Sequence, residues 1–189
     1  MNLLEDPGLY VLQLKADEEL ASAAREAGCL FCGGRLDAAN YPRKPRGVSK
    51  LPDGYDSRFS FCCARDGCRR RTTPASMRFL GRKVYLGAVV VLASAMRHGV
   101  TPARAARLHK LLGVSLRTLA RWREWWRTAF EQSPFWKKTR GLLARPVASE
   151  RLPLSLLECF AGDEQSRLVS LLRLLLPITT SSTRDALAI

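Results

Sequence analysis

The sequence predicts an α+β fold, in which a small antiparallel β unit near the N-terminus precedes a mostly helical remainder. Two observations predict this fold. Paired cysteines bracket two short strand-like runs between residues 29 and 68. From Arg82 onward, the apolar residues instead recur at helical spacing. With 189 residues, 47% of them hydrophobic, the chain is long enough for one domain or two small ones.

The charge of the chain is strongly positive and unevenly placed. The formal net charge is +14, and the segment from Gly67 to Arg145 holds 18 Lys or Arg residues against only Glu124 and Glu131. A basic middle with nearly neutral ends is typical of a protein that binds a polyanion, above all a nucleic acid. A charged surface that serves only solubility is the alternative.

The N-terminus carries no recognisable export signal. Residues 1–14 include Glu5 and Asp6 and lack a basic start followed by an apolar run. We therefore expect a cytoplasmic protein associated with the nucleoid. The longest apolar stretch, Val84 to Met96, has about 13 residues, fewer than the roughly 20 that a bilayer requires. It predicts a buried helix and no membrane partner.

The first cysteine pair has the spacing of metal ligands. Cys29 and Cys32 form a C-x2-C motif followed by two glycines. In a chain without an export signal, such pairs more often bind metal than form disulfides. A tetrahedral site needs two further ligands. Several unrelated buried thiols are the alternative.

The second group offers Cys68 together with Cys62 or Cys63. Strand alternation places Phe59, Phe61 and Cys63 on one face and Cys62 on the other, which favours Cys63 as the ligand and leaves Cys62 as the alternative. Cys159 is far along the chain and is expected to be a small core residue.

These residues predict a zinc ribbon with one structural Zn²⁺ bound by Cys29, Cys32, Cys63 and Cys68. Four thiolates leave no open position for a catalytic water, and a sheet this small would draw much of its folding free energy from the metal. The runs 35–41 and 58–62 are the predicted strands, joined by a loop over 42–55. Ahead of them, Asp17 to Ala27 is predicted to be a short helix.

Turn and cap residues divide the helical region into three pieces. Gly99 and Thr101 separate the first from the second, which begins at Pro102 and runs to Leu112. Gly113 supplies the permissive backbone for a tight turn. A third helix, capped by Ser115, is predicted to extend towards Phe130.

Residues 105–122 closely resemble a helix-turn-helix, with Val114, Leu119 and Trp122 facing inward. In that motif the last helix enters the major groove of DNA. Arg117 and Arg121 lie one turn apart on its outward side, where either could bind guanine O6 and N7. Ser115 and Thr118 share that side and could equally hold phosphate or cap the helix.

Further arginines and lysines are candidates for phosphate contacts that set affinity and salt sensitivity. They are Arg69, Arg70, Arg71, Arg82, Lys83, Arg104, Arg107, Arg123 and Arg127. The aromatic residues Trp122, Trp125, Trp126 and Phe130 recur at helical spacing, which favours a core stripe over a base-stacking platform.

A Leu-rich helix is predicted from Asp163 to Leu176, where Pro177 ends it. Its broad apolar surface is expected to pack against the preceding helices, and a homodimer interface is the alternative. The chain is thus divided into an N-terminal helix and ribbon at 1–80, the helix-turn-helix at 81–132, a helical extension at 133–178 and a flexible tail at 179–189.

The ribbon, the following run from Cys68 to Thr73 and the helix-turn-helix together resemble the N-terminal DNA-binding part of zinc-ribbon transposases of bacterial insertion sequences, or of a protein encoded with them. The resemblance spans about Cys29 to Trp126 and implies binding of double-stranded DNA at element ends or an operator. Full transposases add an RNase H-like domain with three metal-binding acids. No acidic residue after Glu131 follows a strand-like run, so no enzyme activity is expected.

Three functions therefore remain open. The chain could be a transposition factor or a transcription regulator, both of which bind DNA. It could be the non-catalytic subunit of a nucleic-acid enzyme such as a separate transposase chain, bound through the Leu-rich helix. It could also bind RNA through the ribbon and its arginines.

Overall fold

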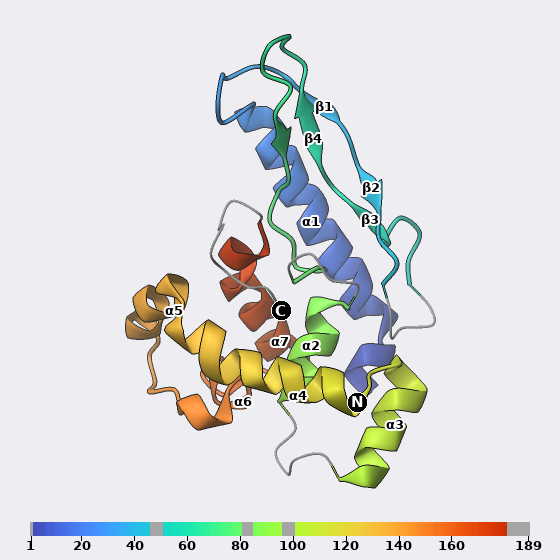
Figure 1. The fold of residues 1–189 in the computed structure, drawn as a ribbon, viewed down its shortest axis with the longest axis vertical. Helices are drawn as coiled ribbons and strands as arrows, with labels where there is room; N and C mark the ends of the chain where they lie inside the picture. The colour runs from blue at the N-terminus through green and yellow to red at the C-terminus, as the bar shows by residue number, and fades with distance from the viewer. Residues whose placement is uncertain (1, 46–50, 81–84, 96–100, 181–189) are drawn as a thin grey trace.

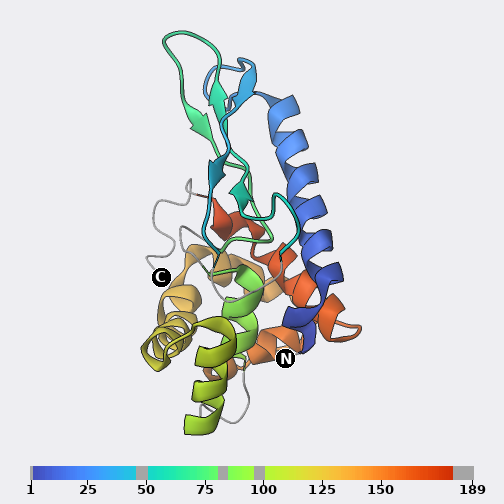
Figure 2. The ribbon, with the colours of Figure 1, turned by 90° about the vertical axis from the view of Figure 1, so that its right-hand side faces the viewer.

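The computed structural model describes residues 2–45, 51–80, 85–95 and 101–180. As the sequence predicts, the fold combines helices with small antiparallel sheets. Figure 1 shows an elongated molecule with the sheets at one end and helices α2 to α7 at the other. The long helix α1 runs beside both, and Figure 2 shows from the side how the strands follow it.

Helix α1 spans Pro7–Ala27, after a short 3-10 turn at Asn2–Glu5. The Asp6 carboxylate accepts a hydrogen bond from the Gly8 N–H at 2.9 Å, and Pro7 occupies the first turn. The prediction of a short helix beginning at Asp17 was therefore wrong: the helix begins ten residues earlier. Asp17 is a buried residue in the middle of the helix and not its cap.

Two small antiparallel sheets follow α1. The first orders its strands β1 (Leu36–Ala38), β4 (Phe61–Cys63) and β5 (Arg71–Thr72), with Leu36 opposite Cys63. The second pairs β2 (Tyr41–Pro42) with β3 (Ser57–Arg58). The two predicted strands are thus each divided into two short ones.

The remaining chain is helical. The α-helices are α2 (Gly87–Ser94), α3 (Pro102–Leu112), α4 (Leu116–Trp125), α5 (Pro134–Thr139), α6 (Leu154–Leu157) and α7 (Glu164–Leu174). A π-helical turn at Trp126–Phe130 prolongs α4, and 3-10 turns lie at Arg140–Leu142, Ser149–Arg151 and Leu176–Thr179. No helix within the described residues is long and apolar enough to cross a membrane.

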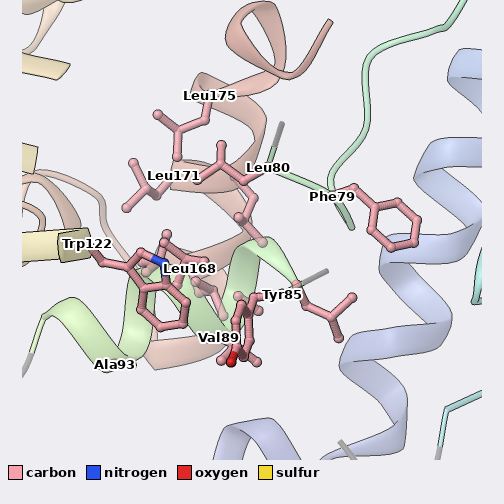
Figure 3. Packing of buried hydrophobic residues seen from close by; sticks show 14 of the residues in the cluster. Phe79, Leu80, Tyr85, Val89, Ala93, Trp122, Leu168, Leu171 and Leu175 are labelled. Carbon is pink, nitrogen blue, oxygen red and sulfur yellow. The ribbon is translucent and has the colours of Figure 1, made fainter. Parts of the chain in front are cut away.

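The larger hydrophobic cluster centres on α2, in which seven of eight residues are buried. Figure 3 shows Val89 and Ala93 of α2 in one cluster with Trp122 of α4 and Leu168 of α7. The Tyr85 and Trp122 rings meet edge to face with centroids 4.9 Å apart. The predicted apolar core stripe on the tryptophan helix and the predicted packing of the Leu-rich helix are both present within this cluster.

A buried ion pair connects α1 to the segment after β5. The Asp17 carboxylate lies 2.7 Å from Nε of Arg78, and neither side chain is exposed. Asp17 also accepts a hydrogen bond from the Met77 N–H. Arg78 donates to the carbonyls of Tyr55 and Ser57. The network therefore links α1 to the segment that leads into β3 and to the segment after β5 that leads to the helical end of the molecule.

Some predictions concern residues outside the described part of the structure. They are the helix boundary at Gly99, the phosphate candidates Arg82 and Lys83, and residues 181–189 of the predicted tail. The start of that tail was predicted wrongly, because Thr179 ends a 3-10 turn, is buried, and accepts a hydrogen bond from the Ser76 N–H at 2.9 Å. The predicted buried helix at Val84–Met96 is described at its centre as α2.

Candidate metal centre and basic surfaces

Four cysteine thiols meet where α1 ends and the three-stranded sheet begins. The Sγ atoms of Cys29, Cys32, Cys63 and Cys68 all lie within 4.8 Å of one another. Sγ of Cys29 is 3.7 Å from that of Cys68, and Sγ of Cys32 is 3.4 Å from that of Cys63. A tetrahedral metal with metal–sulfur bonds of about 2.3 Å would separate its sulfur ligands by about 3.8 Å. The donors therefore fit one metal ion.

The first pair of thiols is presented by a tight turn directly after α1. The N–H groups of Cys32 and Gly33 both donate to the carbonyl of Cys29, at 3.3 and 2.8 Å. The Cys29 N–H in turn donates to the carbonyl of Gly34 at 2.9 Å. These hydrogen bonds hold the turn closed, so the Cys29 and Cys32 thiols both point towards the four-cysteine cluster.

The second pair is presented by β4 and the turn that follows it. Cys63 is the last residue of β4, and its N–H donates to the Arg70 carbonyl at 2.9 Å. The N–H groups of Cys68 and Arg69 both donate to the carbonyl of Arg65. Arg69 has a φ of 45°, a left-handed conformation that reverses the chain into β5.

Glycines allow the two turns to approach each other. A Cβ on Gly34 would lie 3.2 Å from the Cys63 sulfur and 3.3 Å from the Cys32 sulfur. A Cβ on Gly28, whose φ is +75°, would lie 3.1 Å from the Gly33 carbonyl oxygen. Side chains at these positions would displace the ligands, which explains the glycines next to the first pair.

The thiols differ in how readily they ionise. A hydrogen bond from the Gly34 N–H, with contributions from the thiols of Cys63 and Cys68, lowers the pKa of Cys32 to about 7. A backbone hydrogen bond from Arg65 lowers the pKa of Cys63, but burial and the neighbouring thiols outweigh it and raise that pKa to about 12. The four-cysteine cluster therefore ionises readily at one thiol, whereas ionisation of a further thiol is opposed. A divalent cation would remove this opposition.

The other two cysteines lie outside the cluster. Cys62 points away from it, with Sγ 3.4 Å from the Arg69 carbonyl oxygen. Strand alternation therefore identified which of the two adjacent cysteines faces the other thiols. Cys159 is half-buried beside α6, and its Sγ lies 3.3 Å from the Ser155 carbonyl oxygen. It belongs to neither hydrophobic cluster, so the prediction of a core residue was wrong.

Helices α3 and α4 are joined by a short turn with the predicted boundaries. Gly113 has a φ of +61°, and its N–H donates to the His109 carbonyl at 2.9 Å. The Tyr85 hydroxyl donates to the Gly113 carbonyl at 3.3 Å, which fixes the turn to the core. Val114 is then buried, and the Ser115 hydroxyl caps α4 by accepting from the Thr118 N–H.

Helix α4 has one buried and one exposed side. Leu119 and Trp122 are buried in the larger cluster. Ser115, Arg117 and Arg121 are exposed, and Thr118 is half-buried. The single acid of this helix, Glu124, lies 3.5 Å from Arg127. The exposed side therefore carries a net positive charge.

The other predicted phosphate contacts in the described residues fall at three places. Arg123 is half-buried on α4, and Arg127 is exposed on the π-helical turn that follows it. Arg69, Arg70 and Arg71 are exposed beside the four-cysteine cluster. Arg104 and Arg107 belong to α3, and their side chains lie outside the described part of the structure.

Sequence reasoning passed over the two residues between Cys29 and Cys32. Leu30 and Phe31 are 79% and 60% exposed. Their exposure could have been predicted from the C-x2-C spacing. Residues between two ligands of a tight turn point away from the metal, and apolar side chains there have no hydrophobic core to pack against.

Comparisons of the chain with models of known protein families, with curated proteins and with solved structures find no match. The assignment of a function therefore rests on the chemistry of the residues described above.

Proposed function

We propose that this chain is a DNA-binding protein in which α3 and α4 form a helix-turn-helix and a zinc ribbon carries the four cysteines. The observation that carries the proposal is the division of α4 into two sides. Leu119 and Trp122 fix one side to the core, while Arg117 and Arg121 project from the other, one turn apart. Two guanidinium groups on the exposed side of such a helix would suit base edges in the major groove, which supports the proposal.

The charge of the chain supports a polyanionic partner. The net charge is +14, and exposed arginines lie on α4 and beside the four-cysteine cluster. Counterion release by such residues supplies most of the nonspecific affinity for DNA. Base contacts from Arg117 and Arg121 would add the specific part.

We assign Zn²⁺ to the cysteine cluster. Four thiolates at tetrahedral spacing suit zinc or iron, and zinc is the common occupant of closed four-cysteine sites that only stabilise a fold. All four positions are filled by the chain, so in this proposal the metal has a structural role and the chain has no catalytic role of its own.

The ends of a mobile element are the first target that we propose, because the ribbon and helix-turn-helix resemble the DNA-binding part of insertion-sequence transposases. A separate catalytic chain would then be the partner. An operator bound by a transcription regulator is the alternative. Both targets are double-stranded DNA with a preferred sequence.

Selection of bound duplexes from a random pool, with RNA as competitor, tests the central proposal. We expect a recovered motif. On that motif, Arg117→Ala or Arg121→Ala should cost about 1–3 kcal/mol and relax discrimination at one base pair. Arg70→Ala is the matched control, because loss of a phosphate contact should weaken all sequences alike and lower the salt slope by about one.

Titrations at several salt concentrations separate these effects. If the Arg117 and Arg121 variants lose affinity equally for every sequence, α4 only holds phosphate and is not the specificity element. Preferential recovery of RNA would replace DNA by RNA as the partner.

Elemental analysis of two serine variants tests the metal assignment. We expect one zinc per chain in the wild type. Cys63→Ser should lose it, because one of four ligands is removed, whereas Cys62→Ser should keep it, because that thiol faces away from the cluster. The reverse pattern would show that Cys62 is the ligand. Iron found in place of zinc would change the identity of the metal but not the assignment of its ligands.

A further inference from the structure

An exposed apolar tip lies on the turn that carries the first two cysteines. Leu30 and Phe31 are 79% and 60% exposed. The other exposed large apolar side chains within the described residues are Val11, Leu116 and Leu142, and none is next to another in sequence. Leu30 and Phe31 cannot contribute to folding by burial, so their exposure suggests a partner.

Arginines surround this tip. The Arg70 guanidinium carbon lies 4.1 Å from the centroid of the Phe31 ring, so the cation stacks on one face of the aromatic side chain. Arg65, on the second cysteine turn, reaches across with Nη1 3.4 Å from the Cys32 carbonyl oxygen. Arg69, next to Arg70 in sequence, is also exposed, and Asp66 is the single acid between Arg65 and Arg70. The Arg71 guanidinium carbon instead lies 5.7 Å from the centroid of the Tyr41 ring on β2.

We propose that this tip, formed by Leu30, Phe31 and the arginines at 65, 69 and 70, binds unpaired nucleotides of a nucleic-acid strand. Phe31 would stack on a base while the arginines hold the neighbouring phosphates. Aromatic rings combined with a positive track are the usual means of binding single strands without reading their sequence. This inference rests on the proposed nucleic-acid binding but not on the role of α4.

The chemistry favours unpaired bases over an intact duplex. In a duplex the faces of the bases are covered by their neighbours, and only an insertion that unstacks and kinks the helix would expose them. An unpaired base offers its face at little cost. Phe31 is also held in place by the closed turn and by Arg70, so little side-chain freedom is lost on binding.

The arginines make a protein or lipid partner less suitable. Three exposed guanidinium groups against one acid need several anionic groups at short spacing. A strand of nucleic acid supplies one phosphate per nucleotide next to the base that would stack on Phe31. DNA and RNA share this chemistry, so the experiment includes both.

The test is fluorescence anisotropy with the full zinc-loaded chain and three probes: labelled short oligo(dT), oligo(U) of equal length, and a blunt duplex of two annealed strands. We expect single-strand binding by the wild type. Phe31→Ala should weaken it by about fivefold to a hundredfold, as loss of one base–aromatic stack does, and leave duplex binding unchanged. Phe31→Trp should keep it. Leu142→Ala, at another exposed apolar site, is the control and should change nothing.

Phe31→Leu distinguishes stacking from simple apolar contact. We expect it to weaken single-strand binding almost as much as Phe31→Ala, because leucine has no aromatic face. Wild-type affinity in Phe31→Leu or Phe31→Ala overturns the proposal, as does a wild type that does not bind either single strand. Self-association abolished by Phe31→Ala, with single-strand binding intact, would assign the tip to a second copy of this chain instead.

Zinc content of each variant is measured alongside, so that loss of the fold is distinguished from loss of the contact. Stronger binding of oligo(dT) than of oligo(U) would identify DNA as the source of the strand, and the opposite would identify RNA. Either preference supports the proposal that the tip binds unpaired nucleotides. Failure of Arg117→Ala to alter duplex discrimination would count against α4 alone.

Discussion

At the scale of single residues, the buried pair of Asp17 and Arg78 determines how the two ends of the molecule are joined. Both side chains are fully buried, and the guanidinium also lies over the rings of Tyr55, Phe59 and Phe79. Burying two charges is costly unless their hydrogen bonds are satisfied. Here the carboxylate accepts from backbone and side chain, and the guanidinium donates to carbonyls. Removal of one partner would leave the other charge without compensation.

Asp17→Ala should therefore lower the free energy of unfolding by about 3–5 kcal/mol, as expected when one member of a buried pair is removed. Glu18→Ala is the matched control, because Glu18 is the exposed neighbour on the same helix and should change stability by no more than about 0.5 kcal/mol. Chemical denaturation of both variants measures the difference. Equal, small effects would show that the pair contributes little.

The same residue shows where sequence reasoning succeeded and failed. An acid at the start of a run of Ala and Leu is typical of a helix N-terminus, which led to the prediction that the helix begins at Asp17. The true cap is Asp6 with Pro7, a signal present in the sequence. The partner of Asp17 is Arg78, 61 residues away, and no local pattern indicates a contact at that separation.

At the scale of elements, the sheet that carries the cysteines has little core of its own. The cluster of buried residues there contains only Ala21, Cys29, Leu36, Phe61 and Cys63. The larger cluster extends from Leu4 to Ile178 without including any of the four metal-site cysteines. The first should depend on the metal for its stability, and the second should not.

Removal of the metal by a chelator should therefore open the cysteine-bearing sheet and leave most of the helical structure folded. Hydrogen exchange provides the measurement. The amide of Cys63, bonded to the Arg70 carbonyl, should lose protection, whereas that of Val90, bonded to the Leu86 carbonyl, should retain it. Simultaneous loss at both sites would contradict separate stabilities. Chelator added to Cys63→Ser should change neither amide further.

Elements bounded by local chemistry were predicted most closely. Pro102, Gly113 and Ser115 each act through their own backbone or the next turn, and α3 begins and ends, and α4 begins, where these residues indicate. The strands were predicted less well. The strands β2 and β3 have only two residues each, and their bounds depend on their pairing with each other rather than on local sequence. The thiol cluster was predictable because alternation along a strand decides between Cys62 and Cys63.

At the scale of the whole molecule, α1 separates the two basic surfaces. Its 21 residues correspond to about 31 Å at 1.5 Å per residue. The turn carrying Phe31 follows directly at its C-terminal end, while α4 belongs to the helices at the opposite end of the molecule (Figure 1). Asp17 and Arg78 hold α1 at its middle. The two surfaces are therefore separated along a helix whose length is close to that of one turn of B-DNA, about 34 Å.

This spacing leads to a prediction for a DNA that carries both proposed ligands. A duplex containing the sequence preferred by α4 would be followed by a single-stranded segment placed at increasing distance, in steps of two base pairs. Because α1 sets the separation, we expect affinity to be highest when the unpaired segment begins about one helical turn, roughly ten base pairs, from the centre of the α4 site. Competition titrations against the blunt duplex measure the gain at each distance.

Phe31→Ala should remove this maximum without lowering the affinity for the blunt duplex, because the variant loses only the contact at the far end of α1. Arg117→Ala should lower affinity at every distance and leave the position of the maximum unchanged. An affinity that does not vary with distance in the wild type would mean that the two surfaces do not bind one DNA together. In that case α1 would join two independent binding sites, and each would retain its own ligand in the separate titrations.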